Sequence, residues 1–317
     1  MAKLRRVAWI LCAILIATLV FSALAGVMIG PGILHPQRRP LSENVVALVD
    51  RRFAGIGARH EDFAVVARDG ITLRGWKVYP ARPKGDWVAL LHGLGDNRLG
   101  TYGQAEMLLR YGYGVVMMDA RGHGESGGEM VTYGWKERND SKAVDDALLS
   151  SENVGHLFYL GESMGAAVAL QSAGVDSRIA GVVAEASFRN LREVTYDYAG
   201  FQMSPFLGKT LFRPATITAL RSAEKEGGFK ADDVSPEAAV ASRAFPVLLI
   251  CDADDGRIPC RHAQAIYNAA IGPKELWVVP NSGHSMAMGT EPNEFARRVL
   301  AFLANIAGIQ QALPASK

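Results

Sequence analysis

The stretch Gly161-Glu162-Ser163-Met164-Gly165 decides the fold, and it directly follows the apolar run 156–160. That run has the length of a short buried strand, and the small apolar residues 166–170 favour a helix. A serine between two glycines at such a turn is typical of a nucleophile elbow. The glycines let neighbouring backbone pass without a Cβ clash, and the turn strains the serine backbone. The sequence therefore predicts a reactive hydroxyl at Ser163 beside the free N–H groups of a helix start.

Two further motifs accompany the elbow. An apolar run leads into His92-Gly93-Leu94-Gly95, and the next apolar run leads into Asp119-Ala120-Arg121-Gly122-His123-Gly124-Glu125-Ser126. With the elbow, these motifs resemble the α/β-hydrolase superfamily, particularly single-domain serine hydrolases similar to monoglyceride lipases and serine aminopeptidase-like proteins. The resemblance covers roughly residues 60–308 and implies acyl-transfer hydrolysis without a cofactor.

An elbow serine needs a histidine base, and in this family the order along the chain is serine, acid, histidine. Of the seven histidines, only His262 and His284 lie downstream of Ser163. His284 follows a glycine on a loop after a strand-like run, which suits a base that reaches over the sheet edge. His262 begins a helical stretch and is interpreted as a surface histidine. We therefore expect His284 to be the base.

The acid is expected at the end of a buried strand, where Asp252, Asp254 and Asp255 compete. Many family members carry Gly-x-x-Asp-x-x-(Val/Ile)-Pro at this point. Alignment on Ile258-Pro259 favours Asp255 as the acid, with Asp254 as the alternative. The same alignment puts Asp252 where the family has glycine. Glu185, at the end of the preceding strand, is a remote candidate.

The resemblance also implies an oxyanion hole formed by the backbone N–H groups of Leu94 and Met164. Each donor of this kind typically lowers the barrier by ~3–4 kcal/mol. His92 is expected to pack beneath its loop and brace it. Asp119 and Arg121 are expected to be structural and to bond locally.

Apolar runs and helical stretches alternate along the rest of the chain, which predicts a parallel sheet. An Asp69-Gly70 turn between two strand-like runs adds an antiparallel edge hairpin. The predicted fold class is α/β, an α/β-hydrolase fold with a mostly parallel eight-stranded sheet flanked by helices. Parallel strands are expected near 87–91, 114–118, 156–160, 179–184, 246–251 and 275–279, and helices near 102–111, 135–151, 164–172, 261–270 and 291–307.

One region breaks the alternation, because residues 188–243 separate two successive strands where a single helix would suffice. In this family the position carries a helical lid, and aromatic side chains in its first half are expected to wall an apolar acyl pocket or to pack the insertion onto the sheet. These aromatic residues are Phe188, Tyr196, Tyr198, Phe201, Phe206 and Phe212.

The amino terminus carries a membrane signal. After Lys3, Arg5 and Arg6, residues 7–30 contain no charge, and a helix of that length spans ~36 Å, enough for a ~30 Å hydrocarbon core. We expect an uncleaved transmembrane signal-anchor with a catalytic domain outside the cytoplasm. The alternative is a signal peptide cleaved after Ala23-Leu24-Ala25. The expected division is 1–30 signal-anchor, 31–60 linker or stalk, 61–308 hydrolase domain and 309–317 C-terminal tail.

Composition excludes other classes. A net charge of +2 gives no nucleic-acid signature, and no His/Cys cluster has metal-ligand spacing, so neither a metal nor another cofactor is expected. Cys251 and Cys260 bracket the acid loop and could form a disulfide, while Cys12 lies in the apolar run. The sequence leaves the oligomeric state open.

The expected activity is a serine hydrolase that cleaves carboxylic esters or thioesters through Ser163, His284 and Asp255. A membrane position and an aromatic lid favour small or lipid-like acyl substrates. A serine peptidase on the same fold is the alternative. A non-catalytic binding protein on a hydrolase scaffold is a weaker hypothesis, because every position of the expected triad is filled.

Overall fold

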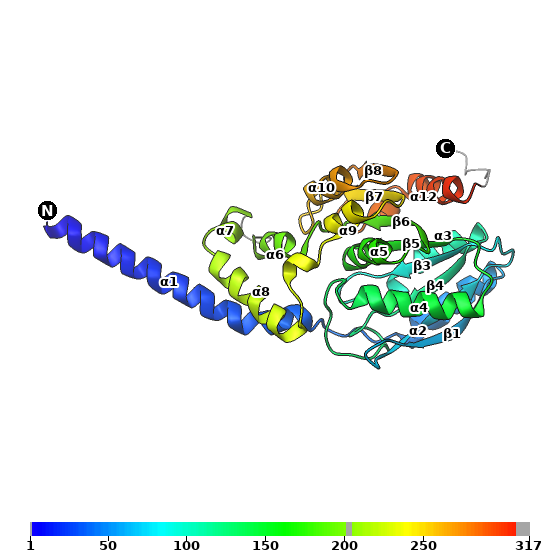
Figure 1. The fold of residues 1–317 in the computed structure, drawn as a ribbon, viewed down its shortest axis with the longest axis horizontal. Helices are drawn as coiled ribbons and strands as arrows, with labels where there is room; N and C mark the ends of the chain where they lie inside the picture. Colours follow the sequence, from blue (N-terminus) through cyan, green and yellow to red (C-terminus); the bar gives the residue numbers. More distant parts are fainter. Residues whose placement is uncertain (1, 201–204, 309–317) are drawn as a thin grey trace.

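The computed structural model describes residues 2–200 and 205–308, built around one eight-stranded sheet in the order β1-β2-β4-β3-β5-β6-β7-β8 (Figure 1). β1 pairs antiparallel with β2, and β2 pairs antiparallel with β4. The remaining neighbours are parallel. The predicted fold class, with its edge hairpin, is confirmed. The strands are β1 (Arg59–Val66), β2 (Thr72–Tyr79), β3 (Trp87–Leu91), β4 (Gly114–Met118), β5 (Leu157–Glu162), β6 (Ile179–Glu185), β7 (Val247–Asp252) and β8 (Lys274–Val279).

The inner strands are continuously apolar because both of their faces are covered. In β3, Val88 and Leu90 pack into one apolar layer, while Trp87 and Ala89 pack into the other. The edge strand β1 alternates instead, with Val65 buried and Val66 66% exposed. This difference explains why the central strands could be located from apolar runs alone.

Helices cover both faces of the sheet (Figure 1). One layer is formed by α2 (Glu43–Gly55), α3 (Tyr102–Arg110), α11 (Ala287–Thr290) and α12 (Pro292–Ala307). The other is formed by α4 (Glu137–Ser151), α5 (Met164–Val175), α9 (Pro236–Ser242) and α10 (Arg261–Ala269). The predicted helices of the alternating part are therefore present.

The insertion between β6 and β7 is helical, as predicted. It contains α6 (Leu191–Gly200), α7 (Pro205–Lys209) and α8 (Arg213–Gly227) before α9 leads back to the sheet. Its buried side chains form a separate apolar cluster that includes Leu191, Val194 and Leu220, together with Leu34 from the N-terminal helix. The insertion is thus packed on itself and on the start of the chain.

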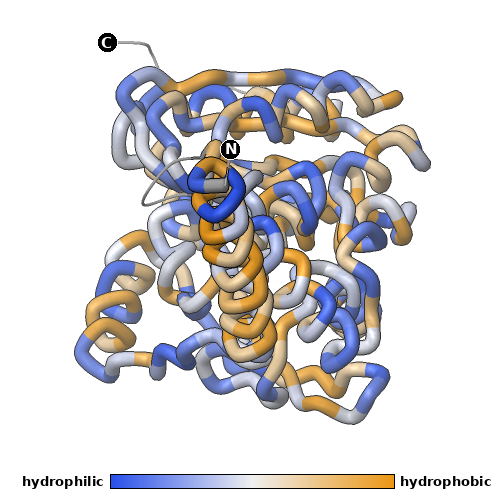
Figure 2. Tube along the Cα trace, turned by 90° about the vertical axis from the view of Figure 1, so that its left-hand side faces the viewer, coloured by the Kyte–Doolittle hydropathy of each residue, from blue (hydrophilic) through white to orange (hydrophobic). Residues whose placement is uncertain are grey.

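Helix α1 (Ala2–Leu34) projects from the body, and its C-terminal end lies beside α8 (Figure 1). It is strongly apolar along most of its length (Figure 2). Within the described residues it is the one helix long and apolar enough to cross a membrane. It ends at Leu34, four residues beyond the expected end at residue 30, and Pro31 lies inside it.

Residues 31–60, expected as a linker, are largely helical and packed. They hold the last turn of α1, the helix α2 and the start of β1. Val49 and Phe53 of α2 are each only 1% exposed and belong to the main core. The three prolines in the first part of the segment suggested a stalk, whereas the amphipathic spacing of Val49 and Phe53 marks a surface helix.

Replacing Phe53 by Ala is expected to lower the free energy of unfolding by about 3–4 kcal/mol, because it removes a fully buried aromatic ring and leaves a cavity. The control is Val45→Ala on the same helix, where the side chain is 41% exposed and the loss should stay below about 1 kcal/mol. Urea unfolding of the full chain in detergent, followed by tryptophan fluorescence, measures both. Equal small losses would show that α2 is a detached linker helix.

Candidate active site

Ser163 stands at a strained turn between β5 and α5. Its backbone has φ 53° and ψ −116°, a conformation that L-residues rarely adopt. A Cβ on Gly165 would overlap the carbonyl oxygen of Leu91, and a Cβ on Gly161 would overlap the carbonyl oxygen of Gly165. Gly165 therefore lets α5 approach β3 closely, and Gly161 lets the start of α5 approach β5. The Ser163 N–H donates to the Glu185 carbonyl oxygen at 2.9 Å, which ties the turn to β6.

Three predicted side chains meet at this turn. The Ser163 Oγ lies 2.9 Å from His284 Nε2, and His284 Nδ1 lies 2.6 Å from Asp255 Oδ2. With Nδ1–H donating to the carboxylate, Nε2 is left to accept the serine proton. The structure thus brings together Ser163, His284 and Asp255 in one hydrogen-bonded chain.

Asp255 is fixed on the loop after β7. Its Oδ1 accepts from the N–H groups of Arg257 at 2.7 Å and Ile258 at 2.9 Å, and its side chain is 1% exposed. The alternative acid, Asp254, is exposed. A disulfide joins Cys251 and Cys260, with Cα atoms 5.4 Å apart, and closes the loop that carries Asp255. The spacing of these cysteines had left that pairing open.

Two carboxyl groups that the sequence did not identify as supports hold the His284 loop. Asp252 accepts from Ser282 Oγ at 2.6 Å and from the Ser285 N–H at 3.0 Å. Glu185 accepts from the Ala287 N–H at 2.9 Å and forms no hydrogen bond with His284 among the described residues. In the sequence, the feature that pointed to Asp252 was its position, because it stands where the family pattern has glycine. Both residues act on His284 through the backbone of its loop.

Asp252, Glu185 and Glu162 end three adjacent strands and form an acidic cluster beneath the site, in which Asp252 and Glu185 are buried and Glu162 is half-buried. Burial, with the nearby Asp96 and Asp252 charges, raises the pKa of Glu162 to about 7. Burial and the charge of Glu162 raise the pKa of Glu185 well above its usual value. Burial also raises the pKa of Asp252. The cluster therefore carries less negative charge at neutral pH than free carboxyl groups would.

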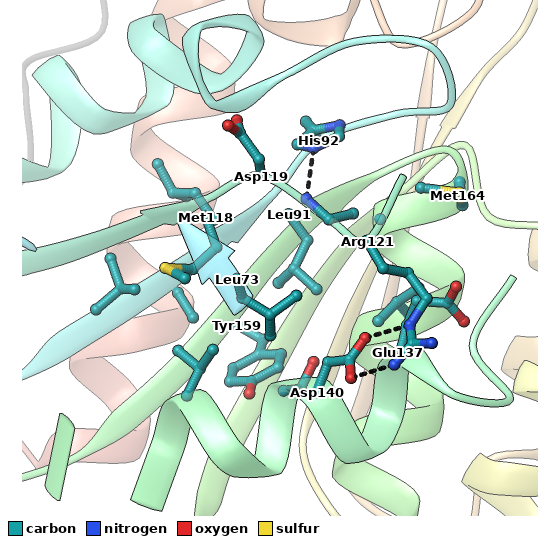
Figure 3. A pocket seen from close by; sticks show the side chains of 18 residues that line it. Leu73, Leu91, His92, Met118, Asp119, Arg121, Glu137, Asp140, Tyr159 and Met164 are labelled. Atoms are coloured by element: carbon teal, nitrogen blue, oxygen red, sulfur yellow. Dashed lines mark hydrogen bonds and ion pairs between the residues drawn. The ribbon is translucent and has the colours of Figure 1, made fainter. Parts of the chain in front are cut away.

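His92 braces the loop after β3, as expected. It is buried, its Nε2 accepts from the Ala120 N–H at 3.0 Å (Figure 3), and its Nδ1 donates to the Gly93 oxygen at 2.8 Å. Burial lowers the pKa of His92. His123 supports the same loop by accepting from the Gly95 N–H at 3.0 Å, and burial lowers the pKa of His123 to about 4. Each ring accepts a backbone N–H at Nε2, as only a neutral imidazole can, so both rings serve the loop rather than the serine.

The predicted donors Leu94 and Met164 line the same cavity as Ser163. Met164 is the first residue of α5, so its N–H has no intrahelical acceptor. Within the described part of the chain, the Leu94 N–H has no hydrogen-bond acceptor.

Arg121 does more than bond locally, because it pairs with Asp140 of α4 at 2.6 Å. This pair lies beside a second cavity, of about 60 Å³ (Figure 3).

The interpretation of His262 as a surface histidine is wrong. Its ring is fully buried, with Nε2 2.7 Å from Asp197 Oδ2 of α6 and Nδ1 accepting from the Arg189 N–H at 3.2 Å. The helical run around residue 262 could not reveal this, because the partner comes from the insertion. His262 therefore links α10 to α6.

The cavity over Ser163 has a volume of about 250 Å³ and a mainly apolar lining. Of the six aromatic residues singled out, Phe188 and Tyr198 line it, whereas Phe206 is 72% exposed and Phe201 lies outside the described residues. The remaining lining is Gly32, Ile33, Pro36, Leu94, Tyr133, Met164, Leu191, Val194, Thr195 and Ile258. Across the described ranges, no group of three or more His, Cys, Asp or Glu side chains could hold a metal ion.

The raised pKa of Glu162 predicts how stability changes with pH. Because the folded state holds this proton up to about pH 7 and the unfolded chain releases it near 4.5, the folded state binds more protons in between. The free energy of unfolding should therefore fall as pH rises through this window, by up to ~1.4 kcal/mol per pH unit. Glu162→Gln should make that slope less steep in chemical unfolding at several pH values, while other buried carboxyl groups, such as Asp145 with a pKa raised by burial to about 7, keep the rest of it.

The matched control is Glu294→Gln. Its ion pairs with Arg297 and Arg298 lower the pKa of Glu294 to about 2, so its titration falls below this window. This control should leave the slope between pH 5 and 7 unchanged. A wild-type slope that survives in Glu162→Gln would contradict the assignment of the titrating group.

Comparisons with known proteins identify the family. The alpha/beta hydrolase family model matches residues 88–298. The uncharacterized protein YqkD of Bacillus subtilis is 29% identical over 248 residues, covering 77% of this chain and 79% of YqkD. The uncharacterized protein YfhR of Escherichia coli K12 is 26% identical over 230 residues, covering 71% and 73%.

Solved structures share the fold. The esterase Pf2001 of Pyrococcus furiosus superimposes with a TM-score of 0.69 at 23% identity, covering 86% of this chain and 98% of the esterase. The acylaminoacyl peptidase of Pyrococcus horikoshii gives 0.62 at 15% identity, covering 80% and 42%. At these identities the likeness concerns the fold alone. With the family model matching most of its length, the chain belongs to the alpha/beta hydrolase family.

Proposed function

We propose that this hydrolase is a membrane-anchored serine hydrolase that cleaves carboxylic esters or thioesters. The observation that carries the proposal is the chain of hydrogen bonds from Ser163 Oγ through His284 to Asp255. The strained turn adds support, because strain at a single residue is typical of functional positions. The apolar lining of the cavity favours an acyl chain over a charged peptide end.

In the proposed reaction, Ser163 Oγ attacks the carbonyl carbon while His284 Nε2 takes the hydroxyl proton. Asp255 orients the ring and stabilises its charged form. The Leu94 and Met164 N–H groups stabilise the oxyanion. The bond from the acyl carbon to the leaving oxygen of an ester, or to the leaving sulfur of a thioester, breaks. The alcohol or thiol leaves with the proton from His284, and an acyl-serine remains. Water then attacks that ester by the same route, releasing the acid and restoring Ser163.

We place the membrane anchor in α1 and the catalytic domain outside the cytoplasm. Lys3, Arg5 and Arg6 precede the apolar helix, which favours a cytoplasmic amino terminus. The Cys251–Cys260 disulfide suits an oxidising compartment. The hydrolase domain expected over 61–308 then also includes α2, whose Val49 and Phe53 lie in its core, and the insertion 188–243 is its lid.

Replacing Ser163 by Ala should abolish hydrolysis of p-nitrophenyl esters from C2 to C16, a loss of about 10⁴-fold or more in kcat, because the attacking oxygen is removed. It should also abolish labelling by a fluorophosphonate probe. The matched control is Ser150→Ala, an exposed serine of α4, which should keep both signals.

Each outcome of this experiment has a consequence. Full activity in Ser163→Ala would exclude Ser163 as the nucleophile. Serine-dependent cleavage of aminoacyl amides without ester cleavage would favour the peptidase alternative. Wild-type protein that is folded, inert toward esters and amides, and unlabelled would favour a binding protein.

The anchor is tested by fractionation. We expect the full chain to stay in the membrane pellet after an alkaline carbonate wash, with an intact mass that still includes residues 1–30, because a helix of this length buries its apolar side chains in the bilayer. Recovery of a soluble protein that begins after residue 25 would support the signal-peptide alternative.

A further inference from the structure

The C-terminal third of α1 is built into the fold through close backbone contact with α8. Ser22, Gly26 and Gly30 recur at four-residue intervals and are buried on one face of α1. A Cβ on Gly26 would overlap the carbonyl oxygen of Ala215, and the Thr218 hydroxyl donates to the Ala23 carbonyl oxygen at 2.8 Å. Small residues at this spacing let two helices approach closely.

The end of α1 is also fixed to the catalytic body. The Val131 N–H donates to the Leu34 carbonyl oxygen at 2.8 Å, and the Tyr133 hydroxyl donates to the Ile33 carbonyl oxygen at 2.6 Å. His35 continues this attachment, with Nδ1 2.9 Å from the Glu129 oxygen and Nε2 2.7 Å from Glu226 of α8. The end of α1 therefore joins the insertion to the loop before α4.

This attachment places α1 in the wall of the catalytic cavity. Gly32 and Ile33 of its last turn, and Pro36 just after it, line the same space as Ser163. Other parts of that wall are Leu191 and Val194 of α6. The substrate space is thus bounded by the core, the insertion and the end of the apolar helix together.

The outer face of α1 remains apolar up to this wall. Val27 is 53% exposed, Met28 is 84% exposed and Ile29 is 61% exposed. Ile29 lies one helical turn before Ile33 on the same face, a separation of ~6 Å along the axis. An apolar surface that would face lipid therefore continues into the lining of the cavity without a polar interruption on this face.

We infer that the substrate is an ester whose long acyl chain lies in the lipid bilayer, and that this chain reaches Ser163 along the Ile29–Ile33 face of α1. Moving a long acyl chain from lipid into water costs free energy. A cavity wall that begins in the bilayer lets the chain reach Ser163 without entering water. This inference rests on the proposed function and adds its substrate class. A substrate that enters from water would have no use for the outer face of α1.

The test uses the full chain in phosphatidylcholine vesicles and two fluorogenic esters with the same leaving group. 4-Methylumbelliferyl oleate dissolves in the bilayer, and 4-methylumbelliferyl acetate dissolves in water. Ile29→Glu places a charge on the proposed path. Met28→Glu is the matched control, because it adds the same charge at the neighbouring exposed position, away from the Ile33 face. Carbonate washing checks that both variants stay in the membrane.

We expect Ile29→Glu to lower kcat/KM for the oleate by about tenfold or more while the acetate rate stays within about twofold, since only the long chain must pass this position. Met28→Glu should change neither rate. A second variant, Ile33→Trp, adds no charge but fills the cavity wall, and should move the preferred chain length from oleate toward shorter esters.

The outcomes separate the inference from the proposed function. Two results would overturn the inference while Ser163-dependent acetate hydrolysis leaves the serine hydrolase intact. In the first, Ile29→Glu and Met28→Glu change oleate hydrolysis equally. In the second, neither Ile29→Glu nor Ile33→Trp has an effect. Preference of the wild type for acetate over bilayer oleate would do the same. Absence of Ser163-dependent turnover of both esters would overturn both.

Discussion

The close contact between α5 and β3 is the constraint on which the rest of the structure depends. Gly165 lies so near the Leu91 carbonyl oxygen that no Cβ fits, and Ser163 makes the positive-φ turn that leads from β5 into this contact. The other groups of the site follow from strand order. The loops after β3, β7 and β8 carry Leu94, Asp255 and His284, and parallel strands bring those ends to one edge of the sheet. A serine displaced from the turn would lose its alignment with all of them.

The site is held at some cost in stability. Asp252 and Glu185 hold the His284 loop by accepting N–H bonds while buried beside Glu162, and burial disfavours the charged form of each. A protonated carboxyl still accepts through its carbonyl oxygen, so the loop keeps its support when the cluster takes up protons. The position of His284 is therefore fixed by buried carboxyl groups whose charged form is disfavoured.

Local patterns predicted most of the fold, because continuous apolar runs mark strands that are buried on both faces. They also predicted the members of the proposed triad, starting from the Gly-x-Ser-x-Gly spacing of the elbow. Asp255 was separable from Asp254 only through the Ile258-Pro259 alignment, since turn aspartates look alike in sequence. The supports Asp252 and Glu185, and the buried His262–Asp197 pair, were not predicted because each contact joins segments whose neighbourhood depends on strand order or on the insertion. The helix α2 was not predicted either, because the prolines before it pointed to a stalk and outweighed the amphipathic spacing of Val49 and Phe53.

The contact between α1 and α8 bears on the choice between an anchor and a cleaved leader. Cleavage after Ala25 would remove Ser22 and the Ala23 carbonyl that accepts from Thr218, yet leave Gly26 to Leu34 seated on α8 and in the cavity wall. Gly26 and Gly30 keep their contacts with α8 in either case. The packing of Ser22 and the hydrogen bond from Thr218 to the Ala23 carbonyl oxygen exist only in the uncleaved chain, so these two contacts favour an anchor. On the proposed function, the same helix that holds the enzyme in the membrane then shapes the space above Ser163, so anchoring and substrate choice share one element.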